Sequence, residues 1–169
     1  MQEYEELGHL NQFSGDASSA EEQYYLPHHM VFKSSSSTTH TRVVYDGSCR
    51  SSNGLSLNDT LLVGPIIQQD LYSIVLRFRT YQIAFTADIA KMYCQVRIHQ
   101  YDRKLQQILW RRSAEEPLRT YKLSTVTYGT ASAPYLATRY LQQLAEDESK
   151  DFTSIRNNNK QFLCGRCSV

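Results

Sequence analysis

Apolar residues recur with the period of an α-helix in two stretches of the chain. The first stretch covers residues 68–81 and the second covers residues 132–149. The apolar positions are Leu71, Ile74, Val75 and Phe78 in the first and Leu136, Tyr140, Leu141 and Leu144 in the second. Because residues three and four positions apart share one face of a helix, this pattern predicts two amphipathic helices. Residues 1–8 form a shorter candidate helix.

Five other stretches favour β-structure. Residues 28–33 and 41–46 are rich in β-branched and aromatic side chains and flank a tip of serine and threonine, which predicts a strand–loop–strand hairpin. Residues 106–112 and 118–126 predict a second antiparallel pair. The apolar segment 82–88, QIAFTAD, predicts a buried strand that ends at an acidic residue.

The order of these elements is β-β-α-β-β-β-α, which favours the α+β fold class with an antiparallel component. Residues 9–23 are polar and predict a loop. Residues 54–65 contain Gly54, Gly64 and Pro65 and predict an irregular connection.

The net charge of +1 hides an uneven distribution along the chain. Residues 1–30 contain six acidic residues and no lysine or arginine, whereas residues 31–112 contain eleven basic and five acidic residues. A basic middle behind an acidic leader fits a polyanionic partner such as a nucleic acid or a nucleotide. Ordinary surface charge is the alternative.

Several classes of protein are disfavoured by composition. No apolar run approaches the roughly 18 residues of a membrane-spanning helix. The first ten residues are acidic and lack the apolar region of a secretory signal. The four cysteines, Cys49, Cys94, Cys164 and Cys167, are too scattered for a disulfide framework. We therefore expect an intracellular protein, cytoplasmic or nuclear, that is neither secreted nor attached to a membrane.

Asp88 is the most informative acidic residue. A carboxylate at the end of an apolar strand costs free energy unless it is paired or binds a cation. Acidic residues are oxygen ligands of the kind that Mg²⁺ prefers. The alternative is that Asp88 caps the turn that follows it. His28 and His29 also suggest a metal site, but no acidic or cysteine partners recur around them at ligand spacing.

Seven blocks of sequence resemble the reverse transcriptase of BEL/Pao-type long-terminal-repeat retrotransposons. In chain order they are YYLPHH (24–29), RVVYDGS (42–48), NGLSLND (53–59), LLVGP (61–65), FTADIAKMYCQV (85–96), ILWRR (108–112) and TVTYGTASAPYLATRYL (125–141). Each block is short, but seven blocks in order with compatible spacing form a specific pattern. The resemblance covers about residues 24–150. Residues 1–23 are then expected to be an acidic, partly disordered segment and residues 151–169 an irregular tail.

The resemblance implies the fingers and part of the palm of a right-hand polymerase, an RNA-directed DNA polymerase. Its chemistry is template-directed nucleotidyl transfer from deoxynucleoside triphosphates, with two Mg²⁺ ions that hold the 3′-hydroxyl and the triphosphate. Asp88 matches the first catalytic aspartate, which binds both ions, and Ile89 would offer its backbone carbonyl. Tyr93 matches the aromatic residue beneath the sugar that excludes a ribose 2′-hydroxyl. Core packing is the alternative for this ring.

Further nucleotide contacts are implied by the same resemblance. Lys33 and Arg42 flank the hairpin tip and match two basic residues that grip the incoming triphosphate, for which arginine offers a two-pronged fork. Without the resemblance they are two exposed bases beside a polar loop. Tyr128 and Gly129 match the motif beneath the nascent base pair, where glycine would let the backbone approach the nucleotide. Many relatives have glutamine at the position of Tyr128, which we interpret as a stacking or sugar contact. Pro134 fits the first turn of the next helix.

The chain contains no pair of adjacent aspartates, the second catalytic signature of the family. The tail Gln161–Val169 can be encoded by codons that, read from one base later, spell Asn-Phe-Tyr-Val-Asp-Asp-Val-Leu. This string has the form of the missing signature. We therefore expect a shift of reading frame near residues 150–161. Cys164 and Cys167 are then a by-product of that shift, and not a redox pair or half of a zinc site.

Three interpretations remain open. The chain is a fragment of a retrotransposon polymerase that binds primer–template and deoxynucleotides, requires the rest of a polyprotein, and is catalytically incomplete with weak or no binding of Mg²⁺. Alternatively, it is a non-catalytic nucleic-acid-binding module that uses the basic fingers. In the third, it is a decayed reading frame without a stable fold, because its sheet would keep an unpaired edge where the Asp-Asp hairpin belongs.

Overall fold

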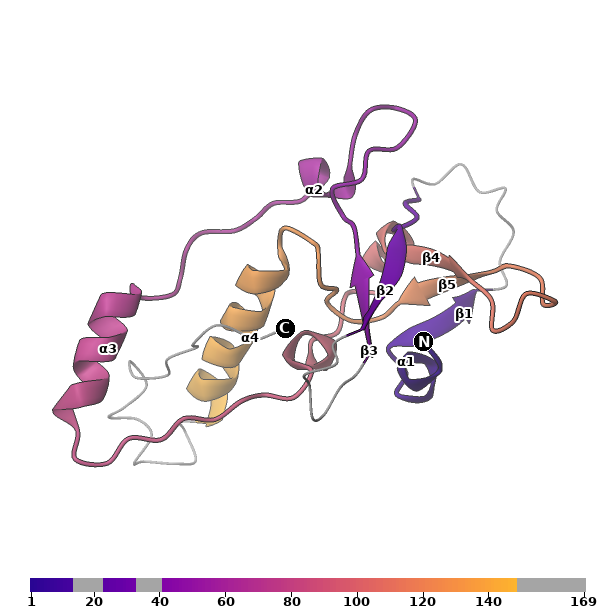
Figure 1. The fold of residues 1–169 in the computed structure, drawn as a ribbon. Coiled ribbons are helices and arrows are strands. Elements are labelled where there is room, and N and C mark those ends of the chain that lie inside the picture. Colours follow the sequence, from indigo (N-terminus) through magenta and orange to yellow (C-terminus); the bar gives the residue numbers. More distant parts are fainter. Residues whose placement is uncertain (14–22, 33–40, 149–169) are drawn as a thin grey trace. The chain divides into compact units, whose positions relative to one another are not determined.

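The computed structural model describes residues 1–13, 23–32 and 41–148, which are mixed α and β in structure (Figure 1). The chain divides into two compact units. Unit 1 joins Met1–Val63 to Tyr93–Ala133, and unit 2 joins Gly64–Met92 to Pro134–Val169. Within the described ranges, no helix has the length and apolar character needed to cross a membrane.

Unit 1 is built on a three-stranded antiparallel sheet with the strand order β1-β5-β4. The strands are β1 (Leu10–Phe13), β4 (Gln107–Trp110) and β5 (Arg119–Leu123). In the central strand β5, Leu123 lies opposite Leu10 of β1, and Tyr121 lies opposite Ile108 of β4. The pairing of β4 with β5 confirms the antiparallel pair predicted from the sequence.

Strand β1 replaces part of the loop predicted for residues 9–23. Only Leu10 and Phe13 are apolar in this strand, so its alternation is too short to be detected. Leu10 is 1% exposed, and pairing with β5 satisfies the backbone groups of the strand. Helix α1 (Gln2–Glu6) precedes it, as predicted. Residues 1–13 belong to unit 1. Residues 14–22 lie outside the described residues.

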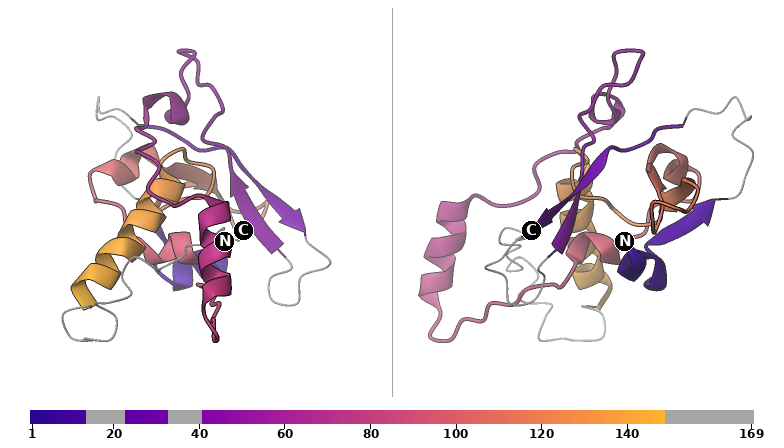
Figure 2. Two further views of the ribbon diagram at one scale, coloured as in Figure 1. Left: turned by 90° about the vertical axis from the view of Figure 1, so that its left-hand side faces the viewer. Right: turned by 45° about the vertical axis from the view of Figure 1, so that its right-hand side comes forward.

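The predicted hairpin is present in unit 1, where β2 (His28–Phe32) pairs antiparallel with β3 (Thr41–Tyr45) (Figure 2). Tyr45 is 3% exposed and belongs to the core, whereas Met30 and Phe32, which alternate onto the same face, are 55% and 71% exposed. The apolar face of the hairpin is thus covered only at its base. The tip, residues 33–40, lies outside the described residues.

The core of unit 1 joins this hairpin to the sheet. It consists of Leu10, Leu26, Tyr45, Leu57, Ile108, Tyr121 and Leu123. The segment before β2 lies along the edge of β4, where the N–H of Leu26 donates to the carbonyl of Gln107 at 2.7 Å and the N–H of Gln107 donates to that of Tyr24 at 3.1 Å. Burial raises the pKa of the Tyr45 hydroxyl, so this group stays protonated inside the core.

A short helix, α2 (Leu57–Thr60), lies inside the predicted irregular connection 54–65. A capping box starts it: the Oγ of Ser56 accepts from the N–H of Asp59 at 3.2 Å, and the Asp59 carboxylate accepts from the N–H of Ser56 at 3.0 Å. With only four residues, the helix has no periodicity to detect. The first-turn hydrogen bonds lower the pKa of Asp59.

Unit 2 contains the two helices predicted from periodicity, α3 (Leu71–Thr80) and, apart from its first residue, α4 (Ala133–Glu148). The Asp70 carboxylate caps α3 and accepts from the N–H of Ser73 at 2.9 Å. No residue of α3 is buried, and Leu71 is 74% exposed. Pro134 is the second residue of α4, consistent with its predicted place in the first turn.

The buried face of α4 differs from the predicted one. Three residues of the apolar face predicted from the sequence are 38–48% exposed: Leu136, Tyr140 and Leu144. The residues that are buried are Ala133, Ala137 and Thr138. Hydrophobic periodicity weights large side chains and therefore missed a face made of small ones, which allow close packing.

The predicted strand at 82–88 is wrong. This segment is irregular, and Ile83 and Phe85 are 73% and 89% exposed. An extended segment becomes a strand only when a neighbouring strand accepts its backbone hydrogen bonds. Across residues 1–13, 23–32 and 41–148, no strand pairs with it.

Candidate functional site

Tyr93 and Tyr128, two residues that the resemblance assigns to the nucleotide pocket, are in contact. Their ring centroids are 4.5 Å apart, with an interplanar angle of 49°. Tyr93 is 9% exposed and Tyr128 is half-buried. Tyr128 is therefore the more accessible ring of the pair, and Tyr93 fits the alternative of core packing as well as a place beneath a sugar.

Backbone pairing positions Tyr93. It lies in a 3-10 turn, η1 (Met92–Gln95), and the residues after it run antiparallel to the segment that leads to Tyr128. The N–H of Val126 donates to the carbonyl of Val96 at 2.8 Å, and the N–H of Ile98 donates to that of Ser124 at 2.9 Å. These hydrogen bonds set the register of the two segments, and the register determines the separation of Tyr93 and Tyr128.

Gly129, next to Tyr128, makes a close approach to protein backbone. Its φ angle is +93°, and a Cβ atom added there would lie 2.1 Å from the carbonyl oxygen of Tyr45. Any side chain at position 129 would therefore collide with the end of β3. The approach that this glycine permits in the structure is to Tyr45, whereas its approach to a nucleotide stays a prediction.

Asn58, which sequence reasoning did not single out, links three of the resembling blocks. Its Nδ2 donates to the carbonyl of Gly129 at 3.0 Å and to the Oγ of Ser48 at 2.8 Å, and its Oδ1 accepts from the N–H of Ala131 at 2.8 Å. Its own N–H donates to the carbonyl of Gly47 at 2.9 Å. The blocks 42–48, 53–59 and 125–141 thus meet at one side chain.

Arg42 lies on β3 opposite Val31 of β2 and is half-buried. Because side chains alternate along a strand, it is on the opposite face of the hairpin from Tyr45. Asp46, just after the strand, accepts from the N–H of Ser48 at 2.9 Å and so stabilises a turn. Lys33, the second predicted triphosphate contact, lies outside the described residues.

Asp88 and Ile89 belong to unit 2, whereas Arg42, Tyr93 and Tyr128 belong to unit 1. Asp88 is exposed in the irregular segment, so the prediction that it ends a buried strand is wrong and its carboxylate remains hydrated. Lys91, three residues later, has a φ of +51°, the one non-glycine residue with positive φ in the part of the chain that the structure describes. The backbone turns sharply at this point.

The two-metal site that the resemblance implies stays a prediction. Two Mg²⁺ ions close together need several oxygen ligands. Among residues 1–13, 23–32 and 41–148, no group of three or more His, Cys, Asp or Glu side chains is placed to hold a metal ion. Asp88 contributes a single carboxylate, and the cysteines at positions 164 and 167 lie outside the described residues.

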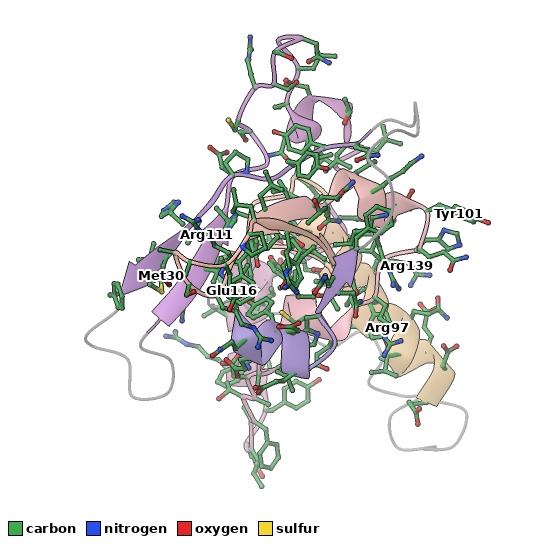
Figure 3. The ribbon with its side chains drawn as sticks, turned by 90° about the vertical axis from the view of Figure 1, so that its right-hand side faces the viewer. Met30, Arg97, Tyr101, Arg111, Glu116 and Arg139 are labelled. Atoms are coloured by element: carbon green, nitrogen blue, oxygen red, sulfur yellow. The ribbon has the colours of Figure 1, made fainter. Side chains whose placement is uncertain are left out.

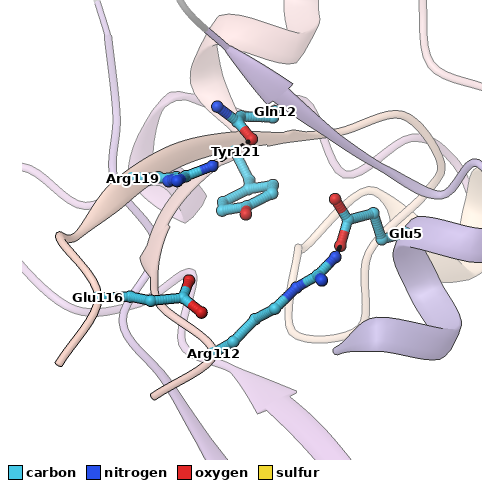
Figure 4. A pocket seen from close by; sticks show the side chains of 6 residues that line it. All are labelled: Glu5, Gln12, Arg112, Glu116, Arg119 and Tyr121. Atoms are coloured by element: carbon cyan, nitrogen blue, oxygen red, sulfur yellow. Dashed lines mark hydrogen bonds and ion pairs between the residues drawn. The ribbon is translucent and has the colours of Figure 1, made fainter. Parts of the chain in front are cut away.

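A polar pocket of about 260 Å³ opens beside β1 and β5 in unit 1 (Figure 4). Its lining consists of Glu5, Gln12, Arg112, Glu116, Arg119 and Tyr121. Arg112 forms an ion pair with Glu5 at 2.8 Å, which raises the pKa of the guanidinium, and Arg119 donates to Gln12 at 3.2 Å. Two arginines and two glutamates balance each other, so the pocket has no net charge to select a phosphate.

Two arginines of unit 1, Arg97 and Arg111, lie on different sides of that unit. Figure 3 shows Arg97 and Tyr101 on one side of unit 1, and Arg111 and Met30 on the other. A nucleic-acid interface usually has basic residues clustered on one face. Arg97 and Arg111 therefore do not share one face of unit 1, and the aromatic pair is a more specific candidate than charge alone.

No protein-family model matches the chain, and no curated protein matches it in sequence.

Proposed function

We propose that the chain is the fingers and partial palm of a reverse transcriptase of the BEL/Pao retrotransposon type. In this proposal it binds primer–template and deoxynucleoside triphosphate, works with the rest of a polyprotein inside the cell, and does not catalyse nucleotidyl transfer by itself. The observation that carries the proposal is the contact between Tyr93 and Tyr128. The resemblance assigns both residues to one nucleotide pocket, although they are thirty-five residues apart in the sequence.

The aromatic pair suits a stacking role. A half-buried ring that contacts a buried one has less freedom to move, and so less conformational entropy is lost when a base or sugar packs on it. Stacking on aromatic side chains contributes roughly 1–3 kcal/mol per base and tolerates different sequences. Tyr128 supplies this surface in the proposal, and Arg42 supplies a guanidinium for a phosphate.

Binding without turnover follows from the acidic residues. Asp88 is the one described residue that matches a catalytic carboxylate of the family. A single carboxylate leaves most of the charge on two neighbouring divalent ions without a partner. The proposal therefore assigns recognition to this chain and leaves chemistry to a complete polymerase.

The test is the affinity of the purified chain for a fluorescein-labelled DNA primer annealed to an RNA template, with and without dTTP and Mg²⁺. Fluorescence anisotropy should show saturable binding that weakens between about 50 and 200 mM salt, because phosphate contacts release counterions. Tyr128→Ala should reduce the affinity roughly tenfold through lost stacking. Tyr72→Ala is the matched control, because Tyr72 is 72% exposed on α3.

A folded chain that binds no primer–template contradicts the proposal. Binding that is equally sensitive to salt but indifferent to Tyr128 and dTTP instead supports the alternative of a non-catalytic nucleic-acid-binding module. A chain without a cooperative thermal transition supports the decayed reading frame.

A further inference from the structure

The turn that carries Tyr128 and Gly129 is held by a side chain from another part of unit 1. Asn58 accepts from the N–H of Ala131 on one side of Gly129 and donates to the carbonyl of Gly129 itself, at 2.8 and 3.0 Å. One primary amide therefore uses both its donor and its acceptor on the same turn. It spans 71 and 73 positions of sequence to do so.

Asn58 is itself fixed. Its backbone N–H donates to the carbonyl of Gly47, it lies in the capped helix α2, and its Nδ2 also donates to the Oγ of Ser48. A Cβ added to Gly47 would lie 2.7 Å from the carbonyl of Gly129 and 2.9 Å from the Oδ1 of Asn58. The two glycines and the amide therefore form one tightly packed contact, which we call the Asn58 junction.

The Asn58 junction restricts a backbone that Gly129 alone would leave flexible. Glycine has more backbone freedom than any other residue, and the φ of +93° at Gly129 is one of many conformations open to it. A turn with such freedom would not hold the neighbouring Tyr128 in one orientation. The hydrogen bonds from Asn58 restrict the backbone at Gly129 and Ala131, directly after the ring that contacts Tyr93.

We propose that Asn58 is a positioning residue that fixes the Tyr128–Gly129 turn, and thereby holds the Tyr128 ring in the orientation that receives a nucleotide. The functional half of this inference rests on the function proposed above. The structural half does not, because it concerns only the turn and its hydrogen bonds.

Asn53 provides a matched control for Asn58. Both are asparagines of the same block, and both side chains accept a backbone N–H, but Asn53 accepts from Leu55 at 2.9 Å and so stabilises only its own turn. Asn53→Ala removes a similar side chain without touching residues 127–131. Asn58→Asp is a second variant, because it keeps an acceptor for the N–H of Ala131 and loses the donor to the carbonyl of Gly129.

The experiment measures two quantities on the full chain. The first is the affinity for the labelled primer–template with dTTP and Mg²⁺, for Asn58→Ala, Tyr128→Ala and the double variant. Each single change should weaken binding about tenfold, since lost hydrogen bonds or stacking act on the same ring. The double variant should be no more than about twofold weaker than either, because coupled residues are not additive. Asn58→Asp should fall between wild type and Asn58→Ala, and Asn53→Ala should stay within about twofold of wild type.

The second quantity is amide hydrogen exchange. Asn58→Ala should accelerate exchange at Ala131 at least tenfold, while the amides of β5 keep their wild-type rates. The single tryptophan, Trp110, packs against Tyr121 at 5.5 Å, and its fluorescence reports whether the variants keep the sheet of unit 1.

The outcomes separate the two proposals. Additive losses of affinity in the double variant, or unchanged binding by Asn58→Ala in a wild-type chain that does bind, overturn the positioning role and leave the proposed function standing. If the wild-type chain binds nothing, the proposed function fails, and the positioning of a nucleotide contact fails with it. Amide hydrogen exchange then still tests whether Asn58 fixes the turn. Faster exchange confined to the turn in Asn58→Ala supports this role, and an unchanged rate at Ala131 overturns it. A variant that loses the sheet is replaced by Asn58→Asp in both measurements.

Discussion

Unit 1 and unit 2 differ in how far the side chains of their apolar segments are buried. In unit 1, Ile108 and Leu123 are 0% and 1% exposed, since they lie in paired strands and their side chains pack in the core. In unit 2, Ile66 and Phe85 are 95% and 89% exposed in segments that form no strand. The contrast teaches that an apolar run is only half of the signal for a strand. The other half is a partner whose backbone groups take its hydrogen bonds.

The largest expected effect concerns catalysis and separates what each unit contributes. The purified chain should give no detectable extension of a primed RNA or DNA template with Mg²⁺ and deoxynucleotides, even if it binds the primer–template. Asp88 offers one carboxylate in unit 2, and loss of one essential group in a catalytic set commonly reduces the rate by several orders of magnitude. A gel-based extension assay measures this.

A complete reverse transcriptase under the same conditions is the positive control for that assay. Extension by the 169-residue chain that disappears in Asp88→Asn would contradict the prediction, because it would show that the chain retains a working metal site.

The next effect compares stability between the units. Ile108→Ala should lower the free energy of unfolding by about 3 kcal/mol, since it leaves a cavity in a closed core. Ile83→Ala should change it by less than about 0.5 kcal/mol, because that side chain is 73% exposed. Urea denaturation followed by far-ultraviolet circular dichroism, to which both units contribute, measures both. Equal losses would mean that residues 82–88 are buried and that the contrast between the units is false.

A smaller effect tests the capping box of α2. Ser56→Ala should cost about 1 kcal/mol, because Ser56 is 4% exposed and its hydroxyl satisfies the N–H of Asp59. Thermal unfolding followed by circular dichroism measures the loss. Ser51→Ala is a suitable comparison, since Ser51 is an exposed serine of the preceding turn. An unchanged stability of Ser56→Ala would show that the helix start does not depend on this cap.

The smallest effect is a pH dependence shared by one helix of each unit. Hydrogen bonds from Ser56 lower the pKa of Asp59 at α2, and hydrogen bonds from Ser73 lower that of Asp70 at α3. A carboxyl whose pKa is lower in the folded state stabilises the fold above its unfolded pKa of 3.8, and this contribution disappears as pH falls through the folded value.

Hydrogen exchange at the first turns of α2 and α3 should therefore accelerate below about pH 4, relative to intrinsic rates. Asp59→Asn should remove the effect in α2 only, and Asp70→Asn in α3 only. An unchanged pH response in both variants would locate the titrating groups elsewhere.

The sequence predicted those elements whose signals are local. The β2–β3 and β4–β5 hairpins join neighbouring segments, and the periodicity of α3 and α4 lies within each helix. Strand β1 escaped detection because its partner Leu123 lies 113 positions from Leu10. The segment 82–88 has the apolar content of a strand, but nothing in its own residues reveals whether another strand pairs with it.

The residues of the candidate site also divide into those that the sequence predicted and one that it did not. Tyr93, Tyr128 and Gly129 were found through the resemblance, and the structure places the two rings in contact. Asn58 was missed because an asparagine in a polar, glycine-containing block looks like any turn residue. Its hydrogen bonds reach Gly129 and Ala131, and no local pattern encodes such a reach. Its presence in one of the resembling blocks was the single available hint.

The pairing of β1 with β5 also has a consequence for synthesis on the ribosome. Leu10 pairs with Leu123, which is synthesised 113 residues later. Until then, β1 of the nascent chain has no neighbouring strand to accept its hydrogen bonds. At typical translation rates this interval is on the order of ten seconds. During it, an open strand edge can pair with another chain. The acidic residues of the first thirty positions repel the same segment of a neighbouring nascent chain. This repulsion would protect β1 from premature association during the interval.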